Sequence, residues 1–365
     1  MLLKSTHIPD IVSAIHKLIG DQKALIAIGE KTAIDIELLI HALNAAGIDF
    51  LGGMFPKLIF DAKVIESGIV VNTLYNVEHI GTIKEISKKN ISIPPMSFDK
   101  NQSYTLVTFV DGLTTEIPHF LRKLYEHYGM ETNYIGGGAG SLTLQQMPCV
   151  FSNEGFFEDT VVYAIVKLKS NIGVKHGWKK LEGPYIVTKS KGNIIQEINW
   201  EKPFKVYKDI VESNSEERFN QDNFFEIAKG YPLGIIKQEL DYVVRDPIAF
   251  NEKDELLCVC NVEENSLINV LKGEPDNLLI AAKEASEESL LHAENPQLAI
   301  VIDCISRVLY LGDTFENELQ NITQTIHNKH PGIPVNGALT LGEISSYGNG
   351  YIEFYNKTIV VGLFE

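Results

Sequence analysis

The chain has 365 residues, 44% of them hydrophobic, and carries a formal net charge of −16 at pH 7. This length favours two domains, and the acidic balance argues against nucleic acid and anionic membranes as main partners, because both select basic surfaces. No apolar run approaches the roughly 18 residues of a membrane span, and the first ten residues are too polar for a signal peptide. We therefore expect a cytoplasmic protein without membrane insertion.

One pattern occurs three times along the chain: an apolar strand, an amphipathic helix, a second strand that ends in small residues, and a turn into a last apolar strand. The first copy consists of residues 24–29, 34–46, 50–53 and 68–71. The second consists of residues 105–111, 116–128, 134–138 and 161–166. The third consists of residues 298–303, 315–328, 335–338 and 358–362. Each copy predicts a strand–helix–strand unit with an added hairpin.

Apolar strands that alternate with helices are typical of parallel or mixed sheets whose faces are covered. The pattern therefore predicts an α/β fold with two domains built from these units and from mixed sheets. Gly137 and Gly337 lie where strands end, and in open α/β sheets ligands collect at that edge. A glycine there permits close approach of a ligand to the backbone, although it serves a tight turn equally well.

A polar and charged run over residues 210–222 separates the second and third copies. Such a run is typical of an exposed connection, so we place a domain boundary near residue 215. The two predicted domains span residues 22–215 and 216–365. In the second domain, Asp276 is the predicted N-cap of a helix over residues 278–292, which has an apolar stripe on one face.

Several short motifs occur in an order found in one known family. His176-Gly177-Trp178, residues 187–198 and residues 136–140 resemble the N-terminal FIST sensory domain. The second half resembles the FIST C-terminal domain through residues 231–234, 244–247, 303–307, 337–344 and 354–358. The resemblance covers roughly residues 22–365, and it depends on many weak motifs in register.

This resemblance implies a non-catalytic sensory module for signal transduction that binds small ligands such as amino acids. One branch of stand-alone FIST proteins carries haem, senses nitric oxide and regulates a partner histidine kinase. This chain resembles that branch because it has no kinase, cyclase or methyl-accepting segment. We expect a haem-based nitric oxide sensor of this kind. A sensor of amino-acid-like ligands without haem is the alternative. Whether the protein forms a homodimer is left open by the sequence.

The candidate ligand-binding side chains are Arg307, Glu343, Asn356 and Cys304. Arg307 follows a core strand and could clamp a carboxylate with two hydrogen bonds, or form an ion pair with an acid such as Glu343. Glu343 could accept a ligand amine, or hold Arg307 or backbone donors. Asn356 could bind a ligand or the loop at Gly337.

A haem group would need an axial ligand, for which histidine is the first expectation. His119, His127 and His176 are the candidates, and without a Cys-x-x-Cys-His motif any haem would be non-covalent. Motifs for a nucleophile elbow, a zinc protease or a phosphate loop do not occur, so we expect no enzyme. The catalytic alternative is a thiol hydrolase in which Cys304 is activated by the nearby Arg307.

Overall fold

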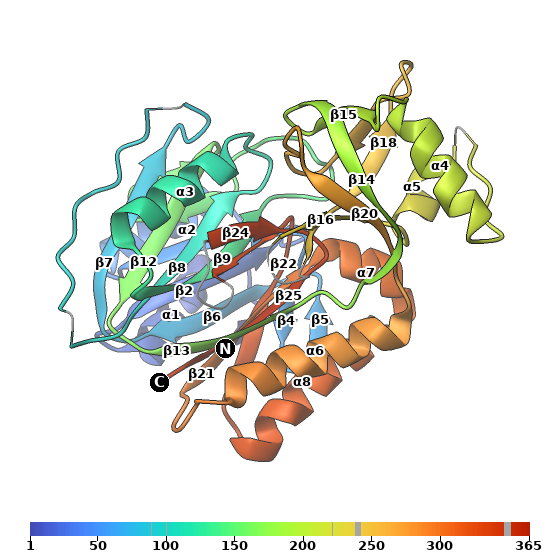
Figure 1. Cartoon of the computed structure of the whole chain (residues 1–365). Coiled ribbons are helices and arrows are strands. Elements are labelled where there is room, and N and C mark those ends of the chain that lie inside the picture. The colour runs from blue at the N-terminus through green and yellow to red at the C-terminus, as the bar shows by residue number, and fades with distance from the viewer. Residues whose placement is uncertain (89, 100, 221, 238–241, 347–351) are drawn as a thin grey trace.

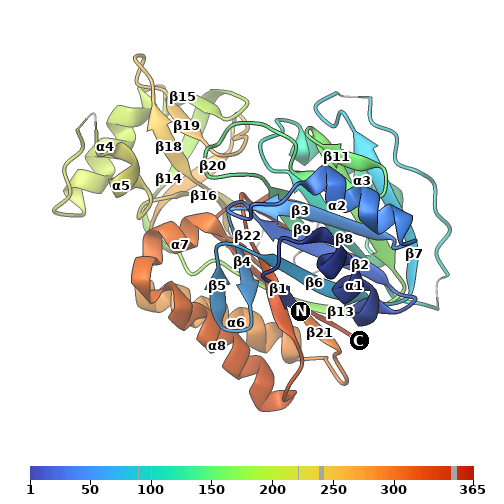
Figure 2. The same cartoon turned by 180° about the vertical axis from the view of Figure 1, so that it is seen from behind.

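The computed structural model describes residues 1–365 except 89, 100, 221, 238–241 and 347–351. Its strands form three six-stranded sheets and one seven-stranded sheet, and helices cover the faces of the sheets (Figures 1 and 2). Each six-stranded sheet contains one parallel pair among antiparallel pairs. The predicted α/β class with mixed sheets is confirmed.

The first predicted repeat forms one unit of the fold. Its elements are β2 (Lys23–Gly29), α2 (Ile36–Ala45), β3 (Phe50–Phe55) and β6 (Ile69–Leu74). β2 lies parallel to β3 and antiparallel to β6, and the short β1 (Leu2–Leu3) extends the sheet beside β6. Helix α1 (Ile8–Ile19) buries Ile11, Ile15 and Ile19, which recur at the spacing of one helix face.

The second and third repeats form units with the same pairing. The second unit contains β7 (Val77–Lys84), β8 (Tyr104–Asp111), α3 (Ile117–Tyr128), β9 (Thr132–Ala139) and β12 (Thr160–Val166). The third contains β13 (Ser170–Lys175), α6 (Pro275–Leu290), β21 (Leu298–Cys304), α7 (Ile305–Leu311), η2 (Gly312–Thr314), α8 (Phe315–Lys329), β22 (Val335–Thr340) and β25 (Ile359–Phe364). In both units the first core strand pairs parallel with the second and antiparallel with the last.

The predicted N-cap of α6 is wrong. The helix begins at Pro275, and its N-cap is Glu274, so Asp276 lies inside the first turn. A proline is well tolerated at the first helical position because its missing N–H would have no partner there. Asp276 still suits its place, because a carboxylate near a helix N-terminus is favoured by the helix dipole.

The added hairpins are exchanged between the units. They are β4 (Lys57–Phe60) with β5 (Lys63–Ile65), β10 (Val150–Ser152) with β11 (Gly155–Phe157), and β23 (Glu343–Ser346) with β24 (Ile352–Tyr355). β10 of the second unit pairs with β3 of the first, β23 of the third with β9 of the second, and β4 of the first with β22 of the third. Each unit thus completes the sheet of another unit.

A separate antiparallel sheet is inserted in the third unit between β13 and α6. We call residues 179–272 the inserted module; Figure 1 shows it at one end of the molecule. Its elements are β14 (Lys179–Lys191), β15 (Ile194–Ile198), α4 (Pro203–Ser213), α5 (Phe224–Ala228), β16 (Leu233–Ile236), β17 (Tyr242–Arg245), β18 (Pro247–Phe250), β19 (Leu256–Cys258) and β20 (Leu267–Lys272). Residue 215 lies between α4 and α5, and strands from both sides of it belong to this one sheet. The division at residue 215 stays a prediction.

No helix in the described residues is both long and apolar enough to cross a membrane.

The small residues of the repeats allow close packing of the parallel strands. Gly52, Gly136 and Gly337 occupy the same register position, opposite Ile26, Thr108 and Val301. A Cβ atom on Gly136 would lie 1.8 Å from the Thr108 carbonyl oxygen, and one on Gly337 would lie 1.7 Å from the Val301 carbonyl oxygen. The role of Gly337 in this structure is therefore close strand packing.

Gly136→Ala should lower the free energy of unfolding by about 3 kcal/mol or more, because the neighbouring backbone must move to admit the methyl group. Urea unfolding followed by circular dichroism measures the change. Gly230→Ala is the matched control, since its Cβ would meet no atom closer than 3.3 Å. A loss below 1 kcal/mol for Gly136→Ala would contradict this account of the strand packing.

Candidate functional site

Most of the buried charge of the molecule gathers where the inserted module meets the third unit. Of the eight buried Asp, Glu, Lys and Arg side chains in the described part of the chain, seven lie there; Asp111 is the exception. We define the junction cluster as these seven together with four uncharged neighbours. Its members are Arg245, Asp246, Cys260, Asp303, Cys304, Ser306, Arg307, Glu318, Glu343, Asn356 and Lys357.

Lys357 and Asp246 join the third unit to the module. The Lys357 ammonium lies 3.1 Å from Asp246 Oδ2, donates to the Lys229 carbonyl at 3.0 Å, and lies 5.0 Å from the centre of the Trp178 ring. The Ser306 hydroxyl donates to the same Asp246 oxygen at 2.8 Å. Burial raises the pKa of Asp246, and the Lys357 charge offsets part of this effect.

Lys357 also has an unusual backbone conformation. Its φ is 53°, in the left-handed region that side chains other than glycine rarely adopt. Its carbonyl accepts hydrogen bonds from the Trp178 indole at 3.0 Å and from Arg307 Nη1 at 3.3 Å. A strained residue that is fully buried and holds four neighbours is typical of a functional site.

Glu343 is a buried carboxyl at a position where the other units are apolar. It begins β23 and lies opposite Gly137, whereas the equivalent hairpin positions in the other two units are Val150 and Leu58. Its oxygens accept from Thr340 Oγ1 at 3.1 Å and from the backbone N–H of Thr358 at 3.2 Å. Burial raises the pKa of Glu343 to about 8, although these bonds and one from Cys304 oppose the rise.

Gly137 contributes to this site through its small size. A Cβ atom there would lie 2.7 Å from the Thr340 methyl group and 3.1 Å from the Gly342 carbonyl oxygen. Any side chain at position 137 would therefore displace the strand end that carries Glu343.

Arg307 is held entirely within the protein. Nε and Nη2 donate to the two Glu318 oxygens at 2.9 and 2.6 Å, and Nε lies 3.3 Å from Asp303 Oδ1. The remaining N–H groups bond to backbone carbonyls, those of His176 at 2.6 Å, Lys357 at 3.3 Å and Leu278 at 3.1 Å. These bonds use all five guanidinium donors. This conformation therefore corresponds to the ion-pair alternative, with Glu318 as the main partner in place of Glu343.

Four buried oxygens of the cluster have no hydrogen-bond partner among the described residues. They are Asn356 Oδ1, Asp246 Oδ1 and both carboxyl oxygens of Asp303, of which Oδ1 has the ionic contact with Arg307. The amide nitrogen of Asn356 donates to the Tyr355 carbonyl at 3.1 Å and to Cys260 Sγ at 3.5 Å, not to the loop at Gly337. Asp246 is fully buried and Asn356 is 1% exposed, so bulk water does not reach these oxygens.

Cys304 is the N-cap residue of α7 and is buried. Burial and the nearby Glu343 raise the pKa of its thiol well above the usual value, although backbone N–H groups of Lys357 and Ser306 oppose the rise. A nucleophilic cysteine needs the opposite shift, because the thiolate is the reactive form. The surroundings of Cys304 in this structure therefore do not favour the hydrolase alternative.

The three candidate haem ligands do not lie together. His119 and His127 belong to α3 in the second unit, and His127 is exposed. His176 follows β13 and accepts the backbone N–H of Trp178 at its Nδ1 at 3.0 Å. Among the described residues, no group of three or more metal-ligating side chains is arranged to hold an ion.

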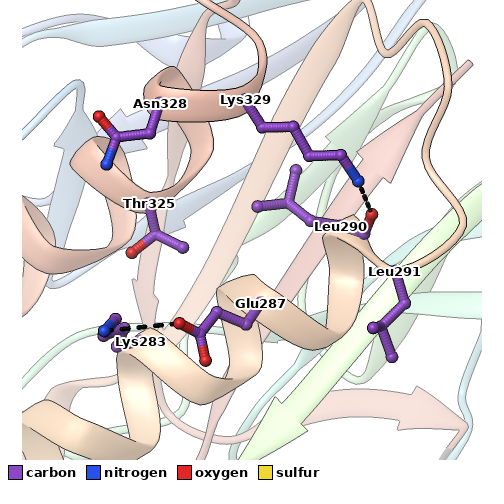
Figure 3. A pocket seen from close by; sticks show the side chains of 7 residues that line it. All are labelled: Lys283, Glu287, Leu290, Leu291, Thr325, Asn328 and Lys329. Atoms are coloured by element: carbon purple, nitrogen blue, oxygen red, sulfur yellow. Dashed lines mark hydrogen bonds and ion pairs between the residues drawn. The ribbon is translucent and has the colours of Figure 1, made fainter.

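The surface also has a shallow groove of about 480 Å³ between the C-terminal parts of α6 and α8 (Figure 3). Its lining consists of Lys283, Glu287, Leu290, Leu291, Thr325, Asn328 and Lys329. Lys283 pairs with Glu287 at 3.5 Å, and Lys329 donates to the Leu290 carbonyl. The groove contains none of the predicted site residues.

The structure brings Arg307, Glu343, Cys304 and Asn356 together and adds residues that the sequence analysis did not select. Asp246 lies in residues 244–247 and Lys357 in residues 354–358, two of the motifs that resemble the FIST C-terminal domain. These motifs could therefore have indicated both residues. Glu318 lies in a helix with many polar residues, and nothing in the sequence distinguished it from its neighbours.

Arg307→Met should lower the free energy of unfolding by about 3–5 kcal/mol, because Glu318 and Asp303 would remain buried without their cation. Chemical denaturation measures this loss. In the control Lys205→Met, which breaks an exposed pair with Glu201, we expect a change below about 0.5 kcal/mol. Equal effects of the two substitutions would contradict the assigned role of Arg307.

Glu343→Gln should change how stability depends on pH. Because the folded pKa of Glu343 is about 8, above its ordinary value of 4.5, the folded state keeps a proton that the unfolded state releases. The resulting stabilisation is complete below about pH 4.5 and is lost as the pH rises to 8, by at most about 1.4 kcal/mol per pH unit. The wild-type stability minus that of Glu343→Gln should therefore fall between pH 5 and 8, and parallel curves would refute the assignment.

Comparison with known families identifies the chain. The FIST N domain model matches residues 77–201, and the FIST C domain model matches residues 203–346. A search of curated proteins finds no match. The residues that match the FIST C domain include most of the junction cluster, and Asn356 and Lys357 follow shortly after them. The chain belongs to the FIST-domain proteins, whose domains are generally small-ligand sensors in signal transduction.

Proposed function

We propose that this protein is a non-catalytic cytoplasmic sensor that binds a small polar ligand at the junction cluster and signals to a partner protein. The observation that supports this most directly is the pair of buried, unpartnered oxygens, Asp246 Oδ1 and Asn356 Oδ1. A buried acceptor without a partner costs roughly 1–3 kcal/mol. A ligand that donates hydrogen bonds to both oxygens would remove that cost.

The position of the cluster supports a role in signalling. Asp246 belongs to the inserted module, whereas Ser306 and Lys357 belong to the third unit, and all three share the contacts at Asp246 Oδ2. A ligand beside Asp246 would compete with or reinforce these contacts. It would shift the position of the module only if it bound one arrangement more tightly than the other.

The family resemblance offers a second version of the proposal, in which a haem group senses nitric oxide and the partner is a histidine kinase. Imidazole would supply the axial bond in this version, with His119, His127 or His176 as ligand. The contacts of these histidines give it no particular support, so the small polar ligand is the version we favour.

Protein purified from haem-supplemented cells should therefore show no stoichiometric Soret band, and reconstitution with haemin should not produce one. The absorption spectrum measures this directly. A stoichiometric band that shifts with nitric oxide and disappears in one of the three histidine variants would favour the haem version.

The favoured version is tested by native mass spectrometry of protein isolated gently from its cells. We expect the wild type to carry one added small-molecule mass, which Asn356→Leu should lose. Asn336→Leu is the matched control, because Asn336 is also buried but donates to Asn72, away from the cluster. An absent mass, or one retained by Asn356→Leu and Asp246→Asn alike, would refute ligand binding at the cluster.

A further inference from the structure

One connection in the second unit is longer than its counterparts in the other two units. Pro56 alone leads from β3 to β4 in the first unit, and Leu341 and Gly342 lead from β22 to β23 in the third. In the second unit, residues 140–149 lie between β9 and β10, and we call this segment the β9–β10 loop. The hairpin pairing does not require this length, because the two shorter connections allow the same kind of pairing.

The β9–β10 loop gathers exposed apolar side chains. Leu142, Leu144 and Met147 are 39%, 50% and 41% exposed. The other exposed large hydrophobic side chains in the described part of the chain are scattered singly. Single exposed apolar residues are normal on a protein surface, whereas a group of them is a mark of an interaction site.

The loop is fixed to the body of the protein by its polar groups. Gln146 Nε2 donates to Asp111 Oδ2 at 2.8 Å, and the backbone N–H of Leu142 donates to Glu30 Oε2 at 3.0 Å. The backbone N–H of Gly140 donates to a carbonyl of β3 in the first unit at 2.8 Å. The polar groups of the loop thus bond inward while its large apolar side chains are exposed, which is the reverse of the usual arrangement.

Leu144 has a backbone conformation that does not favour stability. Its φ is 53°, in the left-handed region, where a Cβ atom crowds the backbone. Burial does not compensate for this cost, since half of the residue is exposed. Asparagine or glycine would adopt this conformation more easily. A leucine here is therefore better explained by contact with another molecule than by the stability of the chain.

Acidic side chains lie beside the loop. The loop itself contains no charged residue. Glu30 accepts from its backbone, and Asp159 accepts from Thr114 Oγ1 at 2.7 Å, a hydroxyl that also contacts the loop at 3.4 Å. Glu158 is exposed, and the carbonyl of the residue before it accepts the backbone N–H of Cys149, at the end of the loop, at 2.9 Å.

The cations on this side of the molecule are fewer and are already paired. Lys31 and Lys57 both contact Glu66, at 2.7 and 3.0 Å. The apolar side chains of the loop are thus bordered mainly by negative charge. A complementary surface is apolar at its centre and basic at its border, because opposite charges at the rim of an interface favour association.

We propose that the β9–β10 loop is the surface through which this protein contacts its partner, and that the partner is a protein with an apolar surface bordered by lysine or arginine side chains. This inference rests on the proposed sensor function and specifies its partner surface. A second copy of the chain is disfavoured as the occupant, because its own loop has the same acidic border. An anionic membrane is disfavoured for the same electrostatic reason.

Photo-crosslinking of the full chain in its own cells tests the inference, with benzoylphenylalanine in place of Leu142. We expect a crosslink to one protein, and mass spectrometry of the joined peptides should show an apolar segment with more lysine and arginine than aspartate and glutamate. The same group in place of Leu291, which is 69% exposed but lies outside the loop, should not capture this protein.

Three variants of the chain that carries this group at position 142 locate the contact. Leu144→Asn should lower the crosslinking yield about tenfold, as expected for the loss of a central apolar contact. It should not lower the urea midpoint of unfolding, because asparagine suits the left-handed backbone. Glu158→Lys should lower the yield about threefold by repelling the basic border. Leu291→Asn is the matched control and should leave the yield unchanged.

The outcomes separate this inference from the ligand site. A crosslink to a second copy, to lipid or to an acidic segment overturns the inference, as does a yield that Leu144→Asn does not change. If no partner is captured but native mass spectrometry shows an added mass that depends on Asn356, the loop inference fails and the sensor function stands. If the partner is captured through the loop but no such mass is found, the loop inference stands and the ligand site fails.

Discussion

The exchange of hairpins between the three units is the constraint on which the rest of the structure depends. Each six-stranded sheet ends on a hairpin that another unit supplies, so no unit can complete its sheet alone. The pairings close a cycle from the first unit to the third, from the third to the second, and from the second to the first. The three units are therefore expected to fold as one body, with the module attached to it.

The same exchange positions the candidate site. β23 must pair with β9, which places Glu343 opposite Gly137, and the chain then returns through β24 to Asn356 and Lys357 before entering β25. The module enters this unit after β13 and returns before α6, so its Asp246 meets that turn. The site is thus formed by segments that are far apart in sequence and that the sheet pairings bring together.

Several of the buried charges at the junction are compensated by neighbouring charges. Arg307 satisfies Glu318 and Asp303 at once, and Lys357 compensates Asp246. Replacing such a network by apolar residues is often neutral or stabilising, so its presence here is better explained by function than by stability. The left-handed backbone of Lys357 and the unpartnered oxygens beside it support the same reading.

Much of the fold was predictable from the sequence, and the missed features share a physical cause. The three repeats could be found because helix and strand periods depend on neighbouring residues, and the helix expected over residues 116–128 is α3, Ile117–Tyr128. The hairpin exchange and the module's sheet depend on pairing between distant strands, which local periodicity does not encode. The N-cap of α6 was misplaced because Pro275 starts the helix earlier than its apolar stripe suggests.

The site was predictable in part for a similar reason. Cys304 and Arg307 are candidates because they lie at the end of a core strand, Glu343 because it follows a turn of small residues, and Asn356 because it precedes the last strand. The structure places all four in one cluster. The partner of Arg307 could not be found from spacing, since Glu318 faces it only through the packing of α8. Asp246 approaches Lys357 across an interface between the module and the third unit, and no sequence period specifies that contact.

The most direct test of the central claim is an experimental structure, at high resolution, of the full chain isolated gently from its cells. The account predicts a bound small molecule whose donor atoms lie about 3 Å from Asp246 Oδ1 and from Asn356 Oδ1, the normal length of such hydrogen bonds. It also predicts a changed Asp246–Lys357 contact, since the ligand shares that carboxylate. A junction that stays closed, with only an ordered water between the two oxygens, would contradict the account.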